Sequence, residues 1–121
     1  MLLRQALWRL GCRYRVNVSW LPGRPDIAFV GSRVAVFCDG DFWHGKDWEE
    51  RRGRLEKGWN AAYWIGKIEA NNGRERRNDE ELRKLGWMPI RVWESDIYHN
   101  PGHVASAIYD IVVERRGAPR R

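Results

Sequence analysis

Apolar residues near the start of the chain recur at intervals of three and four. Leu2, Leu3, Ala6, Leu7 and Leu10 follow this spacing, and Gly11 comes next. Such spacing places the side chains on one face of a helix, and a glycine is a common helix end. The sequence therefore predicts a first helix over residues 2–10.

The next segments have the pattern of β-strands. Apolar and polar residues alternate over residues 14–18, and β-formers fill residues 27–30 and 33–38. A stretch rich in proline and glycine separates the first two segments, and Gly31-Ser32 offers a two-residue turn between the other two. We expect three strands, the second and third forming an antiparallel hairpin.

The middle of the chain changes character twice. Residues 39–60 carry many charges and four glycines without a sustained apolar period, so we expect an irregular insertion. In residues 61–85, the apolar positions Trp64, Ile65, Ile68, Leu82 and Leu85 share one face. We expect one long helix or two, ended by Gly86.

A strand and a helix complete the predicted elements. Residues 88–93 are rich in β-formers, and Asn100-Pro101 supplies an N-cap followed by proline at the first helical position. The last helix should run to about Arg115. The predicted order is α-β-β-β-α-β-α, an α/β fold with helices on both faces of a central mixed sheet.

Length and composition limit the class of protein. The 121 residues suit one domain, and 43% hydrophobic residues can build its core. We expect a single domain over 1–121, with the core over about 2–113 and a basic tail over 114–121. Cys12 and Cys38 lie outside any CxxC pair, which favours reduced thiols in a cytoplasmic chain. No apolar run approaches the ~20 residues of a membrane span.

The charge balance suggests a partner. Lys and Arg number 22 against 16 Asp and Glu, a formal net charge of +6. A basic chain of this size suits a polyanion, so nucleic acid is the first partner to test and a nucleoid-associated location is expected. The alternative is that the basic residues only form a solvated surface. The charge therefore supports a nucleic-acid partner only together with a binding or catalytic site.

Two acids flank the predicted hairpin. Asp26 enters its first strand and Asp39 leaves its second, so the turn brings both to one edge of the sheet. Two carboxylates there can hold a hard divalent cation, which would polarise a phosphodiester and activate a water. On spacing alone, turn-capping roles for both acids are the alternative.

Aromatic residues follow the second acid. Phe42 and Trp43 stand between Asp41 and His44 in a segment without a regular period. Exposed aromatic side chains of this kind can stack on bases, although core packing is their ordinary role. His44 could act as a general acid or base, although a lone histidine is more often structural.

Several motifs along the chain occur together in one known family. They are Leu21-Pro22-Gly23-Arg24-Pro25-Asp26, Val34-Ala35-Val36-Phe37, Asp39-Gly40, Phe42-Trp43-His44-Gly45, Trp64, Lys67-Ile68, Asn71, Arg74 to Arg77, Gly86-Trp87 and Val92-Trp93-Glu94. With these motifs, about residues 5–97 resemble the very short patch repair (Vsr) DNA mismatch endonucleases. The resemblance implies a restriction-endonuclease-like fold of the PD-(D/E)XK superfamily, whose core order of one helix, three strands, a helix and a strand agrees with the predicted order.

The resemblance implies catalytic roles for individual residues. Asp26 would bridge magnesium ions, and the backbone carbonyl of Cys38 would complete their protein ligands. Asp39 stands where family members vary between an acid and histidine. His44 matches the histidine that assists proton transfer, and Glu75 falls where the family has an acid that can orient it.

The resemblance also implies DNA contacts. Phe42 and Trp43 match the aromatics that the family inserts beside a mismatched base pair. Basic and polar residues suit phosphate contact or a tie to the acidic site. These residues are Arg24, Lys67, Asn71, Arg74, Arg76 and Arg77.

Two departures from the family pattern change the expected cofactors and the expected affinity for mismatched DNA. Asp41, residues 46–48 and Ser95 stand where the family has zinc-binding cysteines, and a carboxylate with a lysine cannot make a tetrahedral thiolate site, so we expect no structural zinc. The family's N-terminal acid would fall at or before Met1. Natural trimming, a misassigned start, or compensation by Asp39 and Asp41 are the alternatives, and a weaker grip on mismatches is expected.

The leading functional hypothesis is a magnesium-dependent, Vsr-type endonuclease that nicks one strand of double-stranded DNA at or near a T:G mismatch in repair. A Vsr-fold nickase with a structure-specific or defence target is one alternative. A catalytically weak DNA-binding module is another, although such a module would not need Asp26 and His44. Whether a repair factor or a methyltransferase is a further partner stays open.

Overall fold

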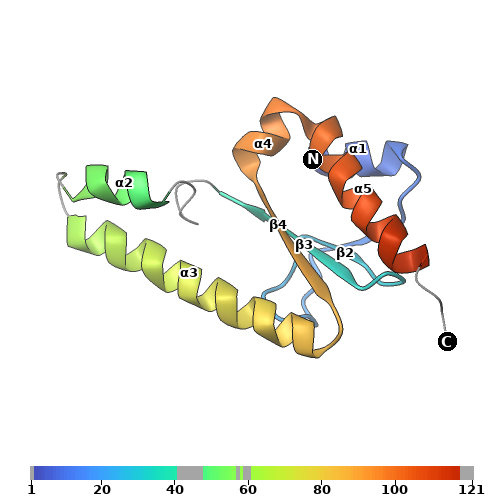
Figure 1. Ribbon diagram of the computed structural model, residues 1–121, viewed down its shortest axis with the longest axis horizontal. Coiled ribbons are helices and arrows are strands. Elements are labelled where there is room, and N and C mark those ends of the chain that lie inside the picture. Colours follow the sequence, from blue (N-terminus) through green and yellow to red (C-terminus); the bar gives the residue numbers. More distant parts are fainter. Residues whose placement is uncertain (1, 41–47, 57, 59–60, 118–121) are drawn as a thin grey trace.

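Four strands form one mixed sheet at the centre of the chain (Figure 1). A computed structural model describes residues 2–40, 48–56, 58 and 61–117. The sheet order is β1 (Arg15–Val16), β2 (Ile27–Phe29), β3 (Val34–Asp39) and β4 (Met88–Trp93). The first three strands are antiparallel and β4 is parallel to β3, which confirms the predicted mixed α/β sheet.

Alternation along β3 divides the core between the two faces of the sheet. Val34 and Val36 face a cluster covered by α1 (Leu2–Arg9), α4 (Glu94–His99) and α5 (Pro101–Gly117). Ala35 and Phe37 face a second cluster, which includes Leu82 of α3 (Ala61–Lys84). Because successive strand side chains point to opposite faces, an almost wholly apolar strand such as β3 is buried on both.

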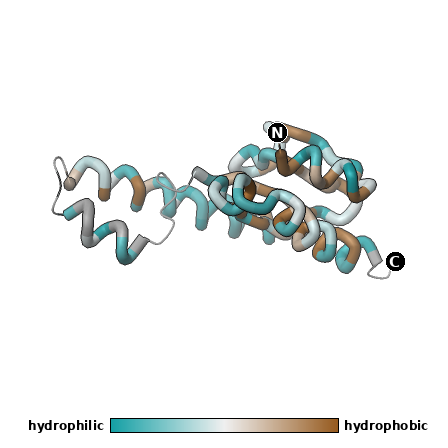
Figure 2. Tube along the Cα trace, turned by 90° about the horizontal axis from the view of Figure 1, so that it is seen from above, coloured by the Kyte–Doolittle hydropathy of each residue, from teal (hydrophilic) through white to brown (hydrophobic). Residues whose placement is uncertain are grey.

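A helical arm extends beyond the sheet. It consists of α2 (Trp48–Leu55) and the first half of α3, which run side by side away from the other helices (Figure 2). The expectation of an irregular segment over residues 39–60 is therefore wrong for α2. Glu49 and Glu50 in the first turn and the Arg52–Glu56 ion pair at 3.8 Å support this helix without an apolar period.

The long helix α3 is single and ends where the glycine predicts. Gly86 has a φ of +86°, and the amides of Gly86 and Trp87 donate to the carbonyls of Arg83 and Leu82. This pattern is the Schellman ending that favours glycine. Burial along the predicted apolar face is uneven, since Ile68 and Leu82 are buried whereas Leu85 is 55% exposed.

The hairpin forms with different bounds from those expected. Phe29 pairs with Val34, so four residues, 30–33, make the turn, and Arg33 within it has a φ of +55°. The first strand shortens to β1 because Asn17 has a φ of +48°, which turns the chain before Val18 enters the second cluster. The predicted strand over residues 14–18 is therefore only partly correct.

The C-terminal helices confirm one prediction and add one element. The Asn100 side chain accepts a hydrogen bond from the His103 amide at 3.0 Å, as expected of an N-cap before Pro101, and α5 runs to Gly117. The short helix α4, which the sequence did not predict, continues directly from β4 and ends at His99. None of the described helices is long and apolar enough to span a membrane.

Candidate active site

Asp26 is fixed at the start of β2 by the end of β3. The Cys38 amide donates a hydrogen bond to Oδ2 of Asp26 at 2.7 Å, a short charge-assisted bond. By the register of the hairpin, Cys38 lies opposite Pro25, whose carbonyl already accepts from the Val18 amide at 3.1 Å. The two strand ends therefore meet at one edge of the sheet, as the sequence predicted.

The turn before Asp26 needs glycine for a close approach to α3. Gly23 has a φ of +78°, which side-chain-bearing residues rarely adopt. A Cβ added there would lie 3.1 Å from both the Phe37 ring and the Asn78 side chain. This contact brings the Pro- and Gly-containing turn against the helix that carries the predicted DNA-binding residues.

An open pocket of about 440 Å³ lies between this turn, the end of β3 and α3. It brings together many of the residues predicted from the sequence. Arg74 also donates a hydrogen bond to Asn71, one turn away on α3. The lining residues are Gly23, Arg24, Asp26, Phe37, Cys38, Asp39, Asn71, Arg74, Glu75, Asn78 and Arg91.

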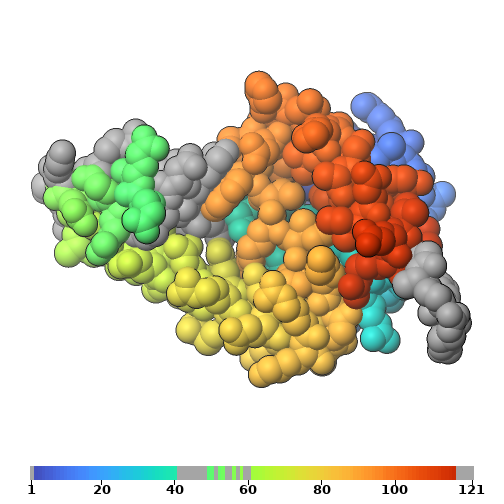
Figure 3. All heavy atoms as spheres, viewed as in Figure 1, coloured from blue at the N-terminus to red at the C-terminus, as the bar shows by residue number. Residues whose placement is uncertain are grey.

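Other predicted residues lie elsewhere. Lys67, Arg76 and Arg77 are not among the described residues that line this pocket. Lys67 Nζ lies 5.6 Å from the centroid of the Tyr63 ring on the helical arm. Arg76 lines a neighbouring hollow of about 350 Å³, together with Asp39, Glu75, Asp79, Arg91 and others. Figure 3 shows the surface hollowed between α3 and β4, with β3 atoms at the bottom.

Three predicted residues fall outside the described part of the chain. Phe42, Trp43 and His44 belong to residues 41–47, which are drawn in grey in Figure 1. Base stacking by the two aromatics and proton transfer by His44 therefore stay predictions. So does the orientation of His44 by Glu75, although Glu75 lines the pocket beside Asp26 and Asp39.

Arg91 is the residue of this region that sequence reasoning missed. It lies in β4 opposite Phe37, and its Nη1 is 3.3 Å from Oδ2 of Asp39, which is 5% exposed. Burial opposes its charged form, but the hydrogen bond to Asp79 and the charges of Asp39, Asp79 and Glu75 outweigh burial and raise the pKa of Arg91. A single arginine in a run of β-formers was the available signal, because buried arginines are nearly always paired.

The pocket edge carries a negative potential. Burial first, and then the charges of Asp26, Asp39 and Glu94, raise the pKa of the Cys38 thiol to about 12. Glu94 shares with Asp26 and Cys38 a second hollow of about 350 Å³, on the side of α4. Clustered carboxylates that suppress ionisation of a thiol also attract a cation.

The donor set fits a magnesium-like ion better than a zinc-like ion. Within the part of the chain that the structure describes, no three His, Cys, Asp or Glu side chains form a group able to hold a metal. A single carboxylate, a backbone oxygen and water suit Mg²⁺, which keeps several waters. Asp26 would supply that carboxylate, and ligation by Asp26, by the Cys38 carbonyl and by Asp39 stays a prediction.

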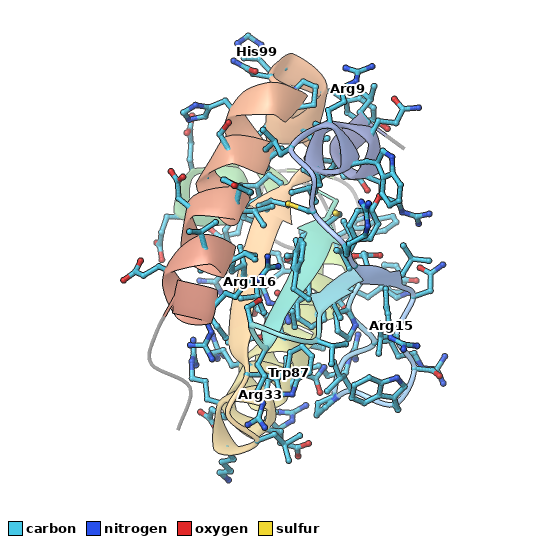
Figure 4. The ribbon with its side chains drawn as sticks, turned by 90° about the vertical axis from the view of Figure 1, so that its right-hand side faces the viewer. Arg9, Arg15, Arg33, Trp87, His99 and Arg116 are labelled. Atoms are coloured by element: carbon cyan, nitrogen blue, oxygen red, sulfur yellow. The ribbon has the colours of Figure 1, made fainter. Side chains whose placement is uncertain are left out.

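Positive charge alone does not locate this site. Arg9 of α1, Arg15 of β1 and Arg116 of α5 all lie on the side of the molecule shown in Figure 4, and none of them lines the pocket beside Asp26. Arg33 and Trp87 lie towards one end of that view and His99 at the other. The site is marked instead by carboxylates and basic side chains that meet at the strand ends.

Comparisons with known proteins identify relatives of this chain. The family described as DNA mismatch endonuclease Vsr matches residues 1–50. A type II nicking enzyme of Neisseria meningitidis serogroup C, V.NmeDIP, is 42% identical over 115 residues, covering 95% of this chain and 76% of the relative. The type II nicking enzyme V.HpaIIP of Haemophilus parainfluenzae is 39% identical over 115 residues, covering 95% and 80%.

A third relative carries the family name itself. The DNA mismatch endonuclease Vsr of Escherichia coli (strain K12) is 36% identical over 84 residues, covering 69% of this chain and 52% of the relative. The two longer matches reach from the first helix to the last, so they include both strand ends and α3. The chain therefore belongs to the Vsr family and is a DNA endonuclease.

Proposed function

We propose that the chain nicks one strand of double-stranded DNA in a reaction that depends on a divalent cation, with magnesium as the expected ion. The observation that carries the proposal is the Asp26 carboxylate, held by the Cys38 amide at the edge of an open pocket whose other walls carry Arg24, Asn71 and Arg74. The names of the relatives as nicking enzymes support single-strand cleavage.

The residues of the pocket divide into two roles. Asp26, joined by the backbone of Cys38, would hold the cation, which supplies charge neutralisation at the phosphate and activation of a water when it is bound. Arg24 and Arg74 line the same pocket and suit contact with the phosphates on either side of the cleaved bond. Asp26 also keeps the negative charge near the cation fixed, so little reorganisation is needed during cleavage.

His44 completes the proposed chemistry as a proton-transfer group. Its sequence position is five residues after the end of β3, the strand that carries Cys38 and Asp39. Histidine as a residue type suits a group that accepts or gives a proton during hydrolysis near neutral pH. Replacement by alanine should leave DNA binding in place and remove most of the cleavage.

Nicking of supercoiled plasmid tests the proposed function. With Mg²⁺, the native chain should convert supercoiled plasmid to the open-circular form, and Asp26→Asn should lose at least about a thousandfold in rate. Asp110→Asn, an exposed acid on α5, is the matched control and should cleave at the native rate. Equal rates for the native chain and Asp26→Asn would contradict the proposed role of Asp26.

The target is proposed to be a T:G mismatch, in a repair role, because one relative is named a mismatch endonuclease. A nickase with another target is the second candidate, because other relatives are named only as type II nicking enzymes. Cleavage of duplexes that differ only by T:G or T:A at one position distinguishes them. Equal rates on the two duplexes would contradict the mismatch target and leave the nicking activity standing.

A further inference from the structure

Arg91 lies where the sheet meets α3. In the parallel pair of β3 and β4 it stands opposite Phe37, and its guanidinium carbon lies 4.1 Å from the centroid of the Phe37 ring. The same alternation that buries Phe37 towards α3 therefore directs Arg91 towards α3 as well. A cation over an aromatic face has a restricted position, because the ring supports one side of the guanidinium plane.

Three carboxylates surround this guanidinium. Nη2 of Arg91 lies 2.8 Å from Oδ1 of Asp79, and Nε lies 3.2 Å from both oxygens of Asp79. Nη1 lies 3.3 Å and 3.4 Å from the oxygens of Asp39 and 3.9 Å from Oε1 of Glu75. All three guanidinium nitrogens thus contact carboxylates, from the end of β3 and from successive turns of α3.

The cluster is poorly exposed and lies on the wall of the site. The side chain of Arg91 is 21% exposed, those of Glu75 and Asp79 are 18% exposed, and that of Asp39 is 7% exposed. Arg91, Asp39 and Glu75 line both the pocket beside Asp26 and the neighbouring hollow beside Arg76. In such surroundings one cation among three carboxylates changes the local potential strongly.

We infer that Arg91 is a positioning residue of the nuclease site, a built-in cation that holds Asp39 and the α3 carboxylates in place and leaves Asp26 as the carboxylate that meets the divalent ion. The inference rests on the proposed function. In this arrangement Asp39 acts through Arg91 rather than as a metal ligand, because the ion pair with Nη1 at 3.3 Å engages its carboxylate with the guanidinium. The same contacts fix α3, and with it Asn71 and Arg74, against the sheet.

Binding of Mn²⁺ without DNA gives a readout separate from cleavage. Arg91→Met removes the charge, releases Asp39 and misplaces α3, so we expect Mn²⁺ to bind about tenfold more tightly. We expect kcat for nicking to fall at least about tenfold, because small displacements of positioning groups are costly. Metal affinity and turnover therefore change in opposite directions, which a loss of stability alone does not produce.

Two further variants separate charge from geometry. Arg91→Lys keeps the charge but loses the planar fork, so Mn²⁺ affinity should stay within about twofold of native while kcat falls. Asp39→Asn should weaken Mn²⁺ binding by no more than about threefold, whereas loss of a direct ligand would weaken it more than about tenfold. In the double variant Arg91→Met with Asp39→Asn, Mn²⁺ affinity should return close to native.

Arg115→Met is the matched control for a partly buried arginine with a purely structural role. Arg115 donates from Nε to the Ser32 carbonyl at 2.8 Å and from Nη2 to the Gly86 carbonyl at 2.9 Å, at the far end of β3 from Asp39. Its loss should lower the unfolding temperature and leave Mn²⁺ affinity and kcat unchanged below that temperature. Circular dichroism gives the unfolding temperature, and electron paramagnetic resonance of free Mn²⁺ gives the affinity.

The outcomes are distinguishable. If Arg91→Met matches Arg115→Met in both Mn²⁺ affinity and kcat, Arg91 is only structural and the inference fails while the proposed function stands. If Asp39→Asn loses Mn²⁺ binding more than about tenfold, Asp39 is a ligand and the inference fails. If the native chain neither binds Mn²⁺ nor nicks DNA, the proposed function fails and the inference fails with it. If Arg91→Met does not fold, the Arg91→Lys and Asp39→Asn results decide.

Discussion

The two faces of the sheet use the same strand for different purposes. Towards α1, α4 and α5, β3 contributes Val34 and Val36 to an apolar cluster. Towards α3, the same strand contributes Phe37, whose ring contacts the guanidinium of Arg91 in the charged cluster. One face therefore supplies most of the burial, and the other carries the chemistry at its end. This division separates substitutions that unfold the protein from substitutions that stop cleavage.

The largest expected effect tests that division with two phenylalanines. Phe29 is 1% exposed in the first cluster, so Phe29→Ala should lower the free energy of unfolding by about 3–5 kcal/mol and leave kcat unchanged where the protein is folded. Phe37→Ala, at a ring that is 5% exposed in the second cluster, should also cost stability and should in addition reduce kcat, because the ring supports Arg91. Denaturant unfolding and plasmid nicking measure both. A larger kcat effect from Phe29→Ala would contradict the division.

The next effect is chemical and concerns pH. Because the pKa of Cys38 is raised to about 12 and an ordinary thiol ionises near 8.5, the folded state keeps Cys38 neutral between these values. At pH 8, iodoacetamide should therefore modify Cys38 of the native metal-free chain at least about a hundredfold more slowly than in the unfolded chain. Mass spectrometry of the peptide gives the rates. Similar rates in the two states would contradict the raised pKa of Cys38, which burial causes first and the nearby carboxylates second.

A smaller effect compares two glycines with positive φ. Gly23 faces Phe37 and Asn78 beside the site, whereas Gly86 ends α3 and faces only the flexible end of Arg33, whose Nη1 would lie 3.0 Å from an added Cβ. Each alanine substitution should cost about 1–2 kcal/mol of stability. Only Gly23→Ala should also lower kcat, which nicking assays below the unfolding temperature would reveal. Equal losses of kcat would contradict a particular role of the turn before Asp26 in cleavage.

The smallest effect concerns salt. Arg74 lines the pocket and Arg15 lies on the exposed edge strand away from it. Arg74→Gln should reduce the slope of log binding constant against log salt by about one phosphate contact, while Arg15→Gln should leave the slope unchanged. Fluorescence anisotropy with a duplex in the absence of metal measures the slope. A matching change in Arg15→Gln would place DNA on both sides of the molecule.

Local sequence signals predicted the parts of the fold that depend on neighbouring residues. The fourth strand has the expected bounds of 88–93, and Asn100 caps the last helix, because propensity and capping are local. Helix α2 escaped prediction because its support is charge spacing rather than an apolar face, and Gly53 lies in its middle. Helix α4 escaped because it is short and continues a strand without a break.

The candidate site was predicted to the extent that it follows from the hairpin. Asp26 and Cys38 meet because one turn fixes both strand ends, which the sequence shows. Arg91 was not predicted, because its partners Asp39 and Asp79 come from separate elements. The parallel pairing of β3 with β4 brings Asp39 to Arg91, and the packing of α3 against β4 brings Asp79. Contacts between strands joined by a long crossover connection, such as β3 and β4, cannot be predicted from local sequence patterns.

The hydrogen bond from the Cys38 amide to the Asp26 carboxylate stands where a backbone hydrogen bond would otherwise continue the pairing of β2 with β3. The Pro25 carbonyl already accepts from the Val18 amide on the other side, so the Asp26 carboxylate accepts from Cys38 instead. The spacing of the two strand backbones therefore sets the position of the carboxylate. The four-residue turn at 30–33 lies at the other end of the hairpin, where added length leaves that hydrogen bond in place. A slip of one residue between the two strands, by contrast, would carry the carboxylate away from its amide and turn the side chains of β3 towards the opposite clusters.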